Sequence, residues 1–222
     1  YIKDGKITEI TSEKIDEPAR ETTDAVGKLV FPGFIETHVH SRDGRQGTGE
    51  KEDFFTSSAA AAAAGVTTMF EMPNCFPPLY SGEKLKDLVE VITPKAHIDF
   101  AVWGLALGDA NIDEIASIAE AGAIAFKLFW GYAIKKDTYQ LIYNYSPDMQ
   151  GVIPPPDEGE IYRMLEEIKK TGLRVGIHAE NFNIVKAMTV REKALGNTNY
   201  EALLRTHPVA CETTVIDTAV GM

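Results

Sequence analysis

From residue 31 onward, the chain alternates between short apolar runs and longer stretches whose apolar residues recur every three or four positions. Strands that alternate with helices at this spacing predict βαβ units and a parallel sheet. The predicted strands cover residues 33–40, 67–72, 98–107, 123–130 and 173–178. The predicted helices cover 52–64, 81–92, 112–121, 157–171 and 181–195, followed by 200–205 and 211–219.

Helix start and stop residues support these boundaries. Asp53 precedes the first helical pattern, three prolines precede residue 157, and Gly65 and Gly172 follow the respective helices. The stretch 132–151 is rich in Asn, Ser, Pro and Gly, and we expect a long loop there. Five βα units are visible. A doubly wound sheet could use five, whereas a closed (β/α)₈ barrel needs eight and about 250 residues, and periodicity alone leaves both open.

The first 30 residues differ from the rest. They contain only short β segments at 1–3, 6–11 and 28–30, with an Asp-Gly turn at residues 4–5. These segments are too small to hold a core alone. The chain also opens without an initiator Met and stops inside a helical pattern, so we expect a fragment of a longer protein.

Composition narrows the class of protein. The 222 residues carry 33 acidic and 22 basic side chains, a net charge of −11, which argues against a nucleic-acid binder. An apolar content of 44 % excludes a disordered chain, and no apolar run reaches the length of a membrane span. No signal peptide pattern opens the chain. The isolated Cys75 and Cys211 indicate reduced thiols and a cytoplasmic protein.

The first candidate for chemistry is the pair His38 and His40, at the end of the first long strand. Alternate residues of a strand point to the same face, so both imidazoles can bind one metal ion. The pair also lies at the carboxyl end of a strand, where active sites of α/β proteins form.

Lys127 lies inside the apolar run 123–130, where an ammonium group is costly to bury. One interpretation is a side chain that reaches water at the end of its strand. The other is a neutral or modified lysine. Addition of CO₂ would convert its amine into a carbamate, an anionic oxygen ligand that can bridge two metal ions.

His178 closes a later apolar run and precedes a helix. A single histidine of this kind is more often structural than a ligand. However, His38, His40, Lys127 and His178 all fall at strand carboxyl ends of successive βα units, and this agreement predicts a metal site. Imidazole nitrogen with carboxylate-like oxygen suits Zn²⁺, with Mn²⁺, Co²⁺ or Fe²⁺ as alternatives. We assign no site role to His97 and His207.

Several segments together carry a resemblance to a known family. They are Phe-Pro-Gly-Phe-Ile-Glu-Thr-His-Val-His at 31–40, Gly-Val-Thr-Thr at 65–68, Glu-Met-Pro-Asn at 71–74, Phe-Lys at 126–127 and His-Ala-Glu-Asn at 178–181. The first resembles the opening of the amidohydrolase superfamily barrel. The combination resembles the cyclic-amide hydrolases: hydantoinases and dihydropyrimidinases, dihydroorotases and allantoinases.

The resemblance implies a (β/α)₈ barrel of which residues 31–222 form about the first five units, with residues 1–30 belonging to a small β-sandwich. It implies two divalent metal ions. His38 and His40 would bind the first, Lys127 would bridge both as a carbamate, and His178 would bind the second. The family also needs a further His ligand and a catalytic Asp, and neither motif has a counterpart here.

The resemblance points to two substrate classes. Tyr132, five residues after Lys127, resembles the tyrosine that contacts the reacting carbonyl in hydantoinases and dihydropyrimidinases, although an ordinary aromatic residue is as common there. Arg42 and Asn74 resemble residues that hold the substrate carboxylate in dihydroorotases. A solvated arginine and a turn asparagine are the plainer alternatives.

We therefore expect a metal-dependent enzyme that opens a cyclic amide or ureide ring, with Lys127 and Tyr132 in catalysis. A hydantoinase or dihydropyrimidinase is favoured, and a dihydroorotase or an allantoinase is the alternative. A third possibility, from another class, is a non-catalytic scaffold protein of the same fold. The resemblance also implies a homo-oligomer, a dimer or a tetramer.

Overall fold

A computed structural model describes residues 1–13, 15–45 and 52–222. The chain divides into two compact units, Tyr1–Pro32 and Gly33–Met222. In the first unit, β1 (Ile2–Lys3) and β2 (Lys6–Ile7) form an antiparallel hairpin. Its turn residues Asp4 and Gly5 both have positive φ, as the Asp-Gly sequence predicts.

Two strand predictions in this first unit are wrong. The strand expected at 6–11 ends at Ile7, and the backbone at 28–30 forms no strand. The reason is the lack of a pairing partner, because β2 is matched only by the two residues of β1 and no described strand lies along 28–30. The apolar side chains Val26 and Leu29 are accordingly exposed.

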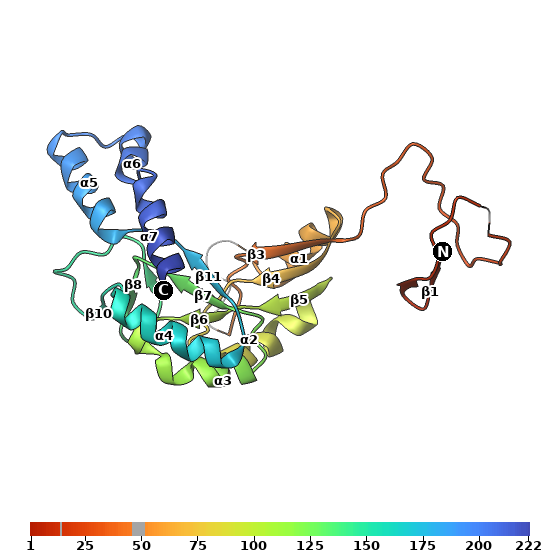
Figure 1. Ribbon diagram of the computed structural model, residues 1–222, viewed down its shortest axis with the longest axis horizontal. Helices are drawn as coiled ribbons and strands as arrows, with labels where there is room; N and C mark the ends of the chain where they lie inside the picture. The colour runs from red at the N-terminus through yellow and green to blue at the C-terminus, as the bar shows by residue number, and fades with distance from the viewer. Residues whose placement is uncertain (14, 46–51) are drawn as a thin grey trace. The chain divides into compact units, whose positions relative to one another are not determined.

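The second unit is a parallel α/β structure. Its strands form two three-stranded parallel sheets, in the orders β3-β4-β5 and β11-β7-β6 (Figure 1). Their bounds are β3 (Phe34–Val39), β4 (Val66–Glu71), β5 (Asp99–Val102), β6 (Gly104–Ala106), β7 (Phe126–Phe129) and β11 (Val175–His178). All five predicted apolar runs form strands, and the run 98–107 is divided at Trp103.

Backbone hydrogen bonds cross the break at Trp103. The N–H of Ile124 donates to Val102 O at 2.9 Å, and the N–H of Gly104 donates to Ala125 O at 2.9 Å. The strands therefore follow one another in the order β3, β4, β5 with β6, β7, β11. Among the described strands none joins β3 to β11, so the sheet does not close into a ring.

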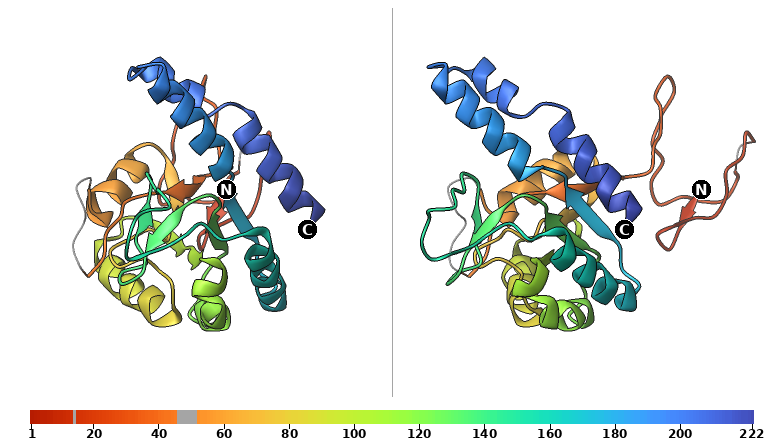
Figure 2. Two further views of the ribbon diagram at one scale, coloured as in Figure 1. Left: turned by 90° about the vertical axis from the view of Figure 1, so that its left-hand side faces the viewer. Right: turned by 60° about the vertical axis from the view of Figure 1, so that its left-hand side comes forward.

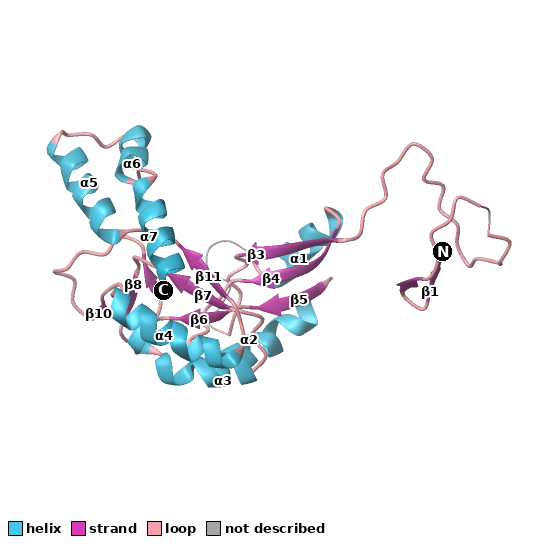
Figure 3. Ribbon diagram, in the orientation of Figure 1, coloured by secondary structure: helices cyan, strands magenta, loops and turns pink. Residues whose placement is uncertain are grey.

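The helices agree with the predicted pattern (Figure 3). Asp53 caps the first helix by accepting from Thr56 N at 2.9 Å, and Gly172 ends the fourth with φ 72°. The helices are α1 (Phe54–Ala63), α2 (Gly82–Ile92), α3 (Ile115–Glu120), α4 (Glu158–Thr171), α5 (Phe182–Ala194), α6 (Tyr200–Thr206) and α7 (Ala210–Gly221), with short 3₁₀ turns at Thr93–Lys95, Gly108–Ala110 and Ile112–Glu114.

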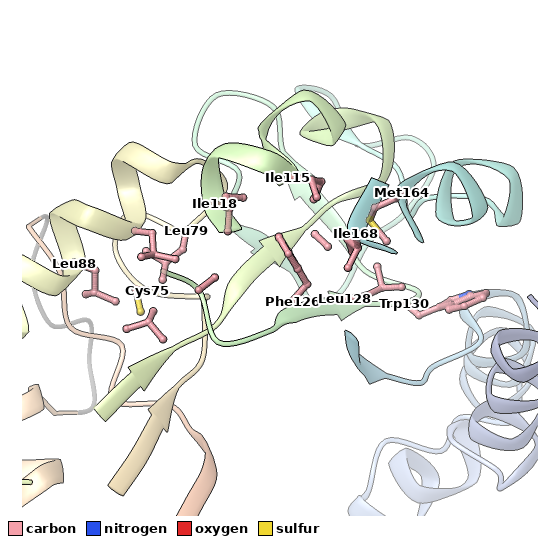
Figure 4. Packing of buried hydrophobic residues seen from close by; sticks show 14 of the residues in the cluster. Cys75, Leu79, Leu88, Ile115, Ile118, Phe126, Leu128, Trp130, Met164 and Ile168 are labelled. Atoms are coloured by element: carbon pink, nitrogen blue, oxygen red, sulfur yellow. The ribbon is translucent and has the colours of Figure 1, made fainter. Parts of the chain in front are cut away.

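Alternation along β7 separates the core from the candidate site. Phe126 and Leu128 are buried on one face with residues of α3 and α4, among them Ile118 and Met164 (Figure 4). Successive strand residues point to opposite faces, so Lys127 and Phe129 lie on the other face. Phe129 belongs there to a second, smaller apolar cluster.

The stretch 132–151 is not the simple loop that its composition predicts. It contributes β8 (Ala133–Lys135) and β9 (Leu141–Ile142), which join β10 (Val152–Ile153) in an antiparallel sheet of order β10-β8-β9. Ile134 is buried in the second apolar cluster, which anchors this sheet to β7. Short strands can thus form and pair in a sequence rich in turn residues when one of their side chains is buried in an apolar cluster.

Helices α5 and α6 lie side by side (Figure 2). The buried carboxylate of Glu192, on α5, accepts from Asn197 Nδ2 at 2.9 Å and from Arg205 Nε at 3.0 Å, which holds the two helices together. Over the described ranges, no helix combines the length and apolar character required to cross a membrane.

Candidate metal centre

His38 and His40 face one another at the carboxyl end of β3. Their Nε2 atoms lie 3.1 Å apart, and their ring centroids are 5.0 Å apart. Partial desolvation and the nearby charge of Lys127 lower the pKa of His38, and burial lowers the pKa of His40 to about 4. Both rings are therefore neutral near pH 7, and a neutral imidazole nitrogen is the form that can bind a metal ion.

The second ring nitrogen of His40 has its own partner. Nδ1 lies 2.7 Å from Oδ1 of Asn74, which follows β4. A carbonyl oxygen can only accept, so the hydrogen-bond network assigns the proton of His40 to Nδ1. Nε2 is left as the acceptor, on the side facing His38. Metal-binding histidines are commonly fixed in this way by a partner at the other ring nitrogen.

Lys127 lies on β7 with 3 % of its surface exposed, and burial lowers its pKa. Within the described residues its ammonium group makes no hydrogen bond or ion pair, and its Nζ lies over the ring of Phe129, 5.2 Å from the ring centroid. Its positive charge contributes to the lowered pKa of both His38 and His40. Of the two interpretations of this lysine, the one in which its side chain reaches solvent at the strand end is contradicted by its burial.

His178 ends β11 beside Tyr132. Its Nε2 lies 3.2 Å from the Tyr132 hydroxyl, which donates to Oε2 of Glu180 at 2.9 Å. Burial and the carboxylate of Glu180 raise the pKa of Tyr132, so the phenol remains protonated near pH 7.

Gly131 allows the close approach of these segments. It has φ 95°, and a Cβ atom added there would lie 2.2 Å from the carbonyl oxygen of Glu180. The N–H of Trp130 also donates to His178 O, at 3.1 Å. A side chain at position 131 would push the two backbones apart, so glycine is what lets the Tyr132 hydroxyl reach Glu180.

Arg42 and Asn74 meet on Tyr143, at the start of the segment that follows β9. Arg42 Nη2 donates to the Tyr143 hydroxyl at 3.3 Å, and Asn74 Nδ2 at 3.5 Å. Nε of Arg42 is buried and has no hydrogen-bond partner in the described part of the chain. The rings of Tyr143 and Tyr132 are 5.6 Å apart, edge to face, so the two groups of polar residues share one edge of the sheet.

The predicted site residues thus lie at or just beyond the carboxyl ends of β3, β4, β7 and β11, except Lys127, which is the second residue of β7. Across residues 1–13, 15–45 and 52–222, no three His, Cys, Asp or Glu side chains are arranged to hold a metal ion by themselves. The sequence analysis did not single out Glu71, Tyr143 or Glu180. It assigned no role to His207, whose Nε2 lies 3.9 Å from Oε1 of Glu180.

A comparison of the sequence with protein-family models gives a result that agrees with this fold and with the site residues at this edge of the sheet. The model of the amidohydrolase family matches residues 29–207, and the chain belongs to that family.

The relatives with similar sequences include proteins named hydantoinase and allantoinase. The chain is 30 % identical to the L-hydantoinase of Paenarthrobacter aurescens and 31 % identical to an allantoinase of Deinococcus radiodurans, each over 99 % of this chain. A D-hydantoinase of Geobacillus stearothermophilus is 33 % identical over 92 % of this chain. The chain spans 44 %, 45 % and 40 % of these three relatives, respectively, which is less than half of each.

Solved structures of hydantoinases are also similar to this chain, and the chain again covers less than half of each. The L-hydantoinase from Arthrobacter aurescens superposes with a TM-score of 0.80 at 30 % identity, covering 98 % of this chain and 45 % of that one. A D-hydantoinase superposes with a TM-score of 0.69 at 25 % identity, covering 92 % and 41 %.

Proposed function

We propose that the protein is a metal-dependent hydrolase that opens a cyclic amide ring, of the hydantoinase or dihydropyrimidinase kind. The observation that carries this proposal is the pair of neutral imidazoles, His38 and His40, with Nε2 atoms 3.1 Å apart beside the buried Lys127. The hydantoinases and allantoinases to which the chain is similar support it.

The residues present fit two divalent ions. His38 and His40 would hold the first and His178 the second, with Lys127 between them as a carbamate formed with CO₂. Carbamate formation needs the neutral amine, and the lowered pKa of the buried, unpaired Lys127 favours that form. Imidazole with an anionic oxygen ligand favours Zn²⁺.

Bound divalent ions would lower the pKa of a water molecule and polarise the ring carbonyl. The chain's own residues supply orientation and a proton donor. Asn74 fixes the tautomer of His40. Tyr132, kept protonated by burial, can turn its hydroxyl from Glu180 to the oxygen of the reacting carbonyl and stabilise the negative charge that develops there.

An allantoinase or a dihydroorotase is the second candidate, and Arg42 favours it. Its guanidinium has a buried Nε without a partner among the described residues and two neighbours that are neutral, Asn74 and Tyr143. Such a group suits a substrate carboxylate or ureido group. Asn74 is already committed through Oδ1 to His40, so only its Nδ2 remains for a substrate.

We further propose that residues 31–222 form the first five units of a (β/α)₈ barrel. In this proposal residues 1–30 belong to a small β-sandwich, and the protein forms a dimer or a tetramer. The open edges of β3 and β11 are compatible with additional strands. A non-catalytic scaffold protein of the same fold is the remaining alternative, and it predicts no bound metal.

The test is turnover by the full-length protein of four compounds: hydantoin, dihydrouracil, allantoin and dihydroorotate. Hydrolysis of the first two, lost on chelation and restored by Zn²⁺, is the expected result. Faster hydrolysis of allantoin or dihydroorotate would select the second candidate. No metal-dependent hydrolysis of any of the four would contradict the proposal.

A further inference from the structure

Glu71 is a buried carboxylate next to the metal site that the proposed chemistry does not use. It is the last residue of β4 and is 1 % exposed. Its Oε2 accepts from the backbone N–H of Ser41 at 3.1 Å, and its Oε1 accepts from that of Arg42 at 2.9 Å. One carboxylate therefore holds the two residues that directly follow His40.

The backbone before His40 is held by the same strand. Val39 pairs with Glu71 in the parallel register, and Val39 O accepts from Met72 N at 2.8 Å. His40 thus lies between two fixed points, one formed by the main chain of β4 and the other by the Glu71 side chain. Beyond it, Arg42 has φ 59°, a left-handed conformation that non-glycine residues seldom adopt. The bond to Arg42 N stabilises this turn.

The environment of Glu71 is unfavourable for a carboxylate. Within the described residues it forms no ion pair, and it also accepts from the Cys75 thiol, with Sγ at 3.7 Å from Oε1. Burial raises its pKa to about 7, although both backbone N–H groups act in the opposite direction. Since no ion pair among the described residues offsets the cost of burial, the contribution of this side chain lies in the backbone geometry that it imposes.

We propose that Glu71 is a positioning residue, which orients His40 toward the metal and Arg42 toward the substrate by holding the turn at residues 41–42. This inference rests on the proposed function, because it assigns Glu71 to the ligand shell behind that site. Tertiary contacts of this kind, behind the ligands, typically change metal affinity 10–100-fold when they are removed.

The test compares Glu71→Gln with Glu192→Gln in the full-length protein. Glutamine keeps the size of the side chain, but its amide nitrogen cannot accept the second N–H bond. Glu192 is the matched control, a glutamate with 3 % exposure that joins α5 to α6 and whose side-chain hydrogen-bond partners among the described residues are Arg191, Asn197 and Arg205. Both metal-free variants and the wild type are titrated with Zn²⁺, and folding is checked by circular dichroism.

We expect Zn²⁺ affinity to fall about 10–100-fold in Glu71→Gln and to stay at the wild-type value in Glu192→Gln. Equal affinities in a folded Glu71→Gln variant and the wild type would overturn the inference. A wild type that binds no Zn²⁺ would instead overturn the proposed function, so the two failures are distinguishable.

A second measurement applies if Glu71→Gln does not fold. In the wild-type protein, the amide hydrogens of Ser41 and Arg42 should be protected from exchange, because both are bonded to a buried carboxylate. Exchange of these two amides at the rate of an unstructured peptide would overturn the inference without any variant.

Discussion

Oδ1 of Asn74 lies 2.7 Å from Nδ1 of His40, and this contact determines which nitrogen of the ring faces His38. The two residues come from neighbouring strands and are 34 positions apart in the chain. Asn74, which the sequence analysis relates to substrate binding, thus also orients His40, a proposed metal ligand.

Asn74→Ala removes this partner and leaves the His40 ring free to rotate and to change tautomer. We expect Zn²⁺ affinity, measured by titration of the metal-free protein, to fall about 10–100-fold. Asn199→Ala is the control, since Asn199 caps α6 by accepting from Ala202 N and should cost only about 1 kcal/mol of stability. Unchanged affinity in Asn74→Ala would show that the tautomer is fixed in another way.

Lys127→Ala should remove the group that we propose bridges the two metal ions. We expect loss of bound metal and of activity in the full-length protein, with partial recovery of activity on addition of short carboxylic acids that replace the carbamate oxygens. Lys135→Ala, at an exposed position on β8, is the control and should change neither. Metal content and activity that survive in Lys127→Ala would exclude the carbamate role.

Arg42→Ala distinguishes the two substrate classes. If the guanidinium holds a carboxylate, KM for dihydroorotate should rise about 10–100-fold, the equivalent of a charged hydrogen bond, while KM for hydantoin barely changes. Arg45→Ala, which removes a surface ion pair with Asp87, provides the comparison. An equal rise in KM for both substrates would argue against carboxylate recognition.

Gly131→Ala should destabilise the protein beyond the cost of a positive φ. Gly122 has nearly the same φ, 98° against 95°, but open space where a Cβ atom would lie. We expect denaturant unfolding to show a loss about 1–3 kcal/mol larger for Gly131→Ala than for Gly122→Ala, because only the first forces the Glu180 backbone away. Equal losses would mean that the two segments can separate without cost.

Much of the fold follows from local pattern. Apolar runs and helix caps predict β3 to β7, β11 and the helices of the second unit, and residues such as Asp53 and Gly172 fix helix ends through their own hydrogen bonds and φ angles. The predictions that fail depend on contacts between residues far apart in the chain. The segment 28–30, predicted as a strand, pairs with no described strand. The segment 132–151, predicted as a loop, forms a small sheet because Ile134 packs into the second apolar cluster.

The distinction between local pattern and non-local contact also applies to the residues of the site. His38, His40 and His178 can be found because they lie at the end of apolar strands, and Lys127 because it is a charged residue within one. Tyr143 cannot, since its contact with Arg42 joins residues 101 positions apart. Glu71 and Glu180 lay within segments that the sequence analysis singled out. An acidic residue at or just after the end of an apolar run was the only signal in the sequence. The partner groups are the backbone N–H of Ser41 for Glu71 and the hydroxyl of Tyr132 for Glu180, and only the tertiary structure brings them near.

The measurement that tests the account most directly is the metal content of the purified full-length protein, determined by elemental analysis beside a His38→Ala/His40→Ala double variant. Binuclear chemistry predicts about two divalent ions per chain in the wild type and a clear loss in the variant. A wild type without bound divalent metal, or a double variant that retains the full complement, would contradict the proposed hydrolase.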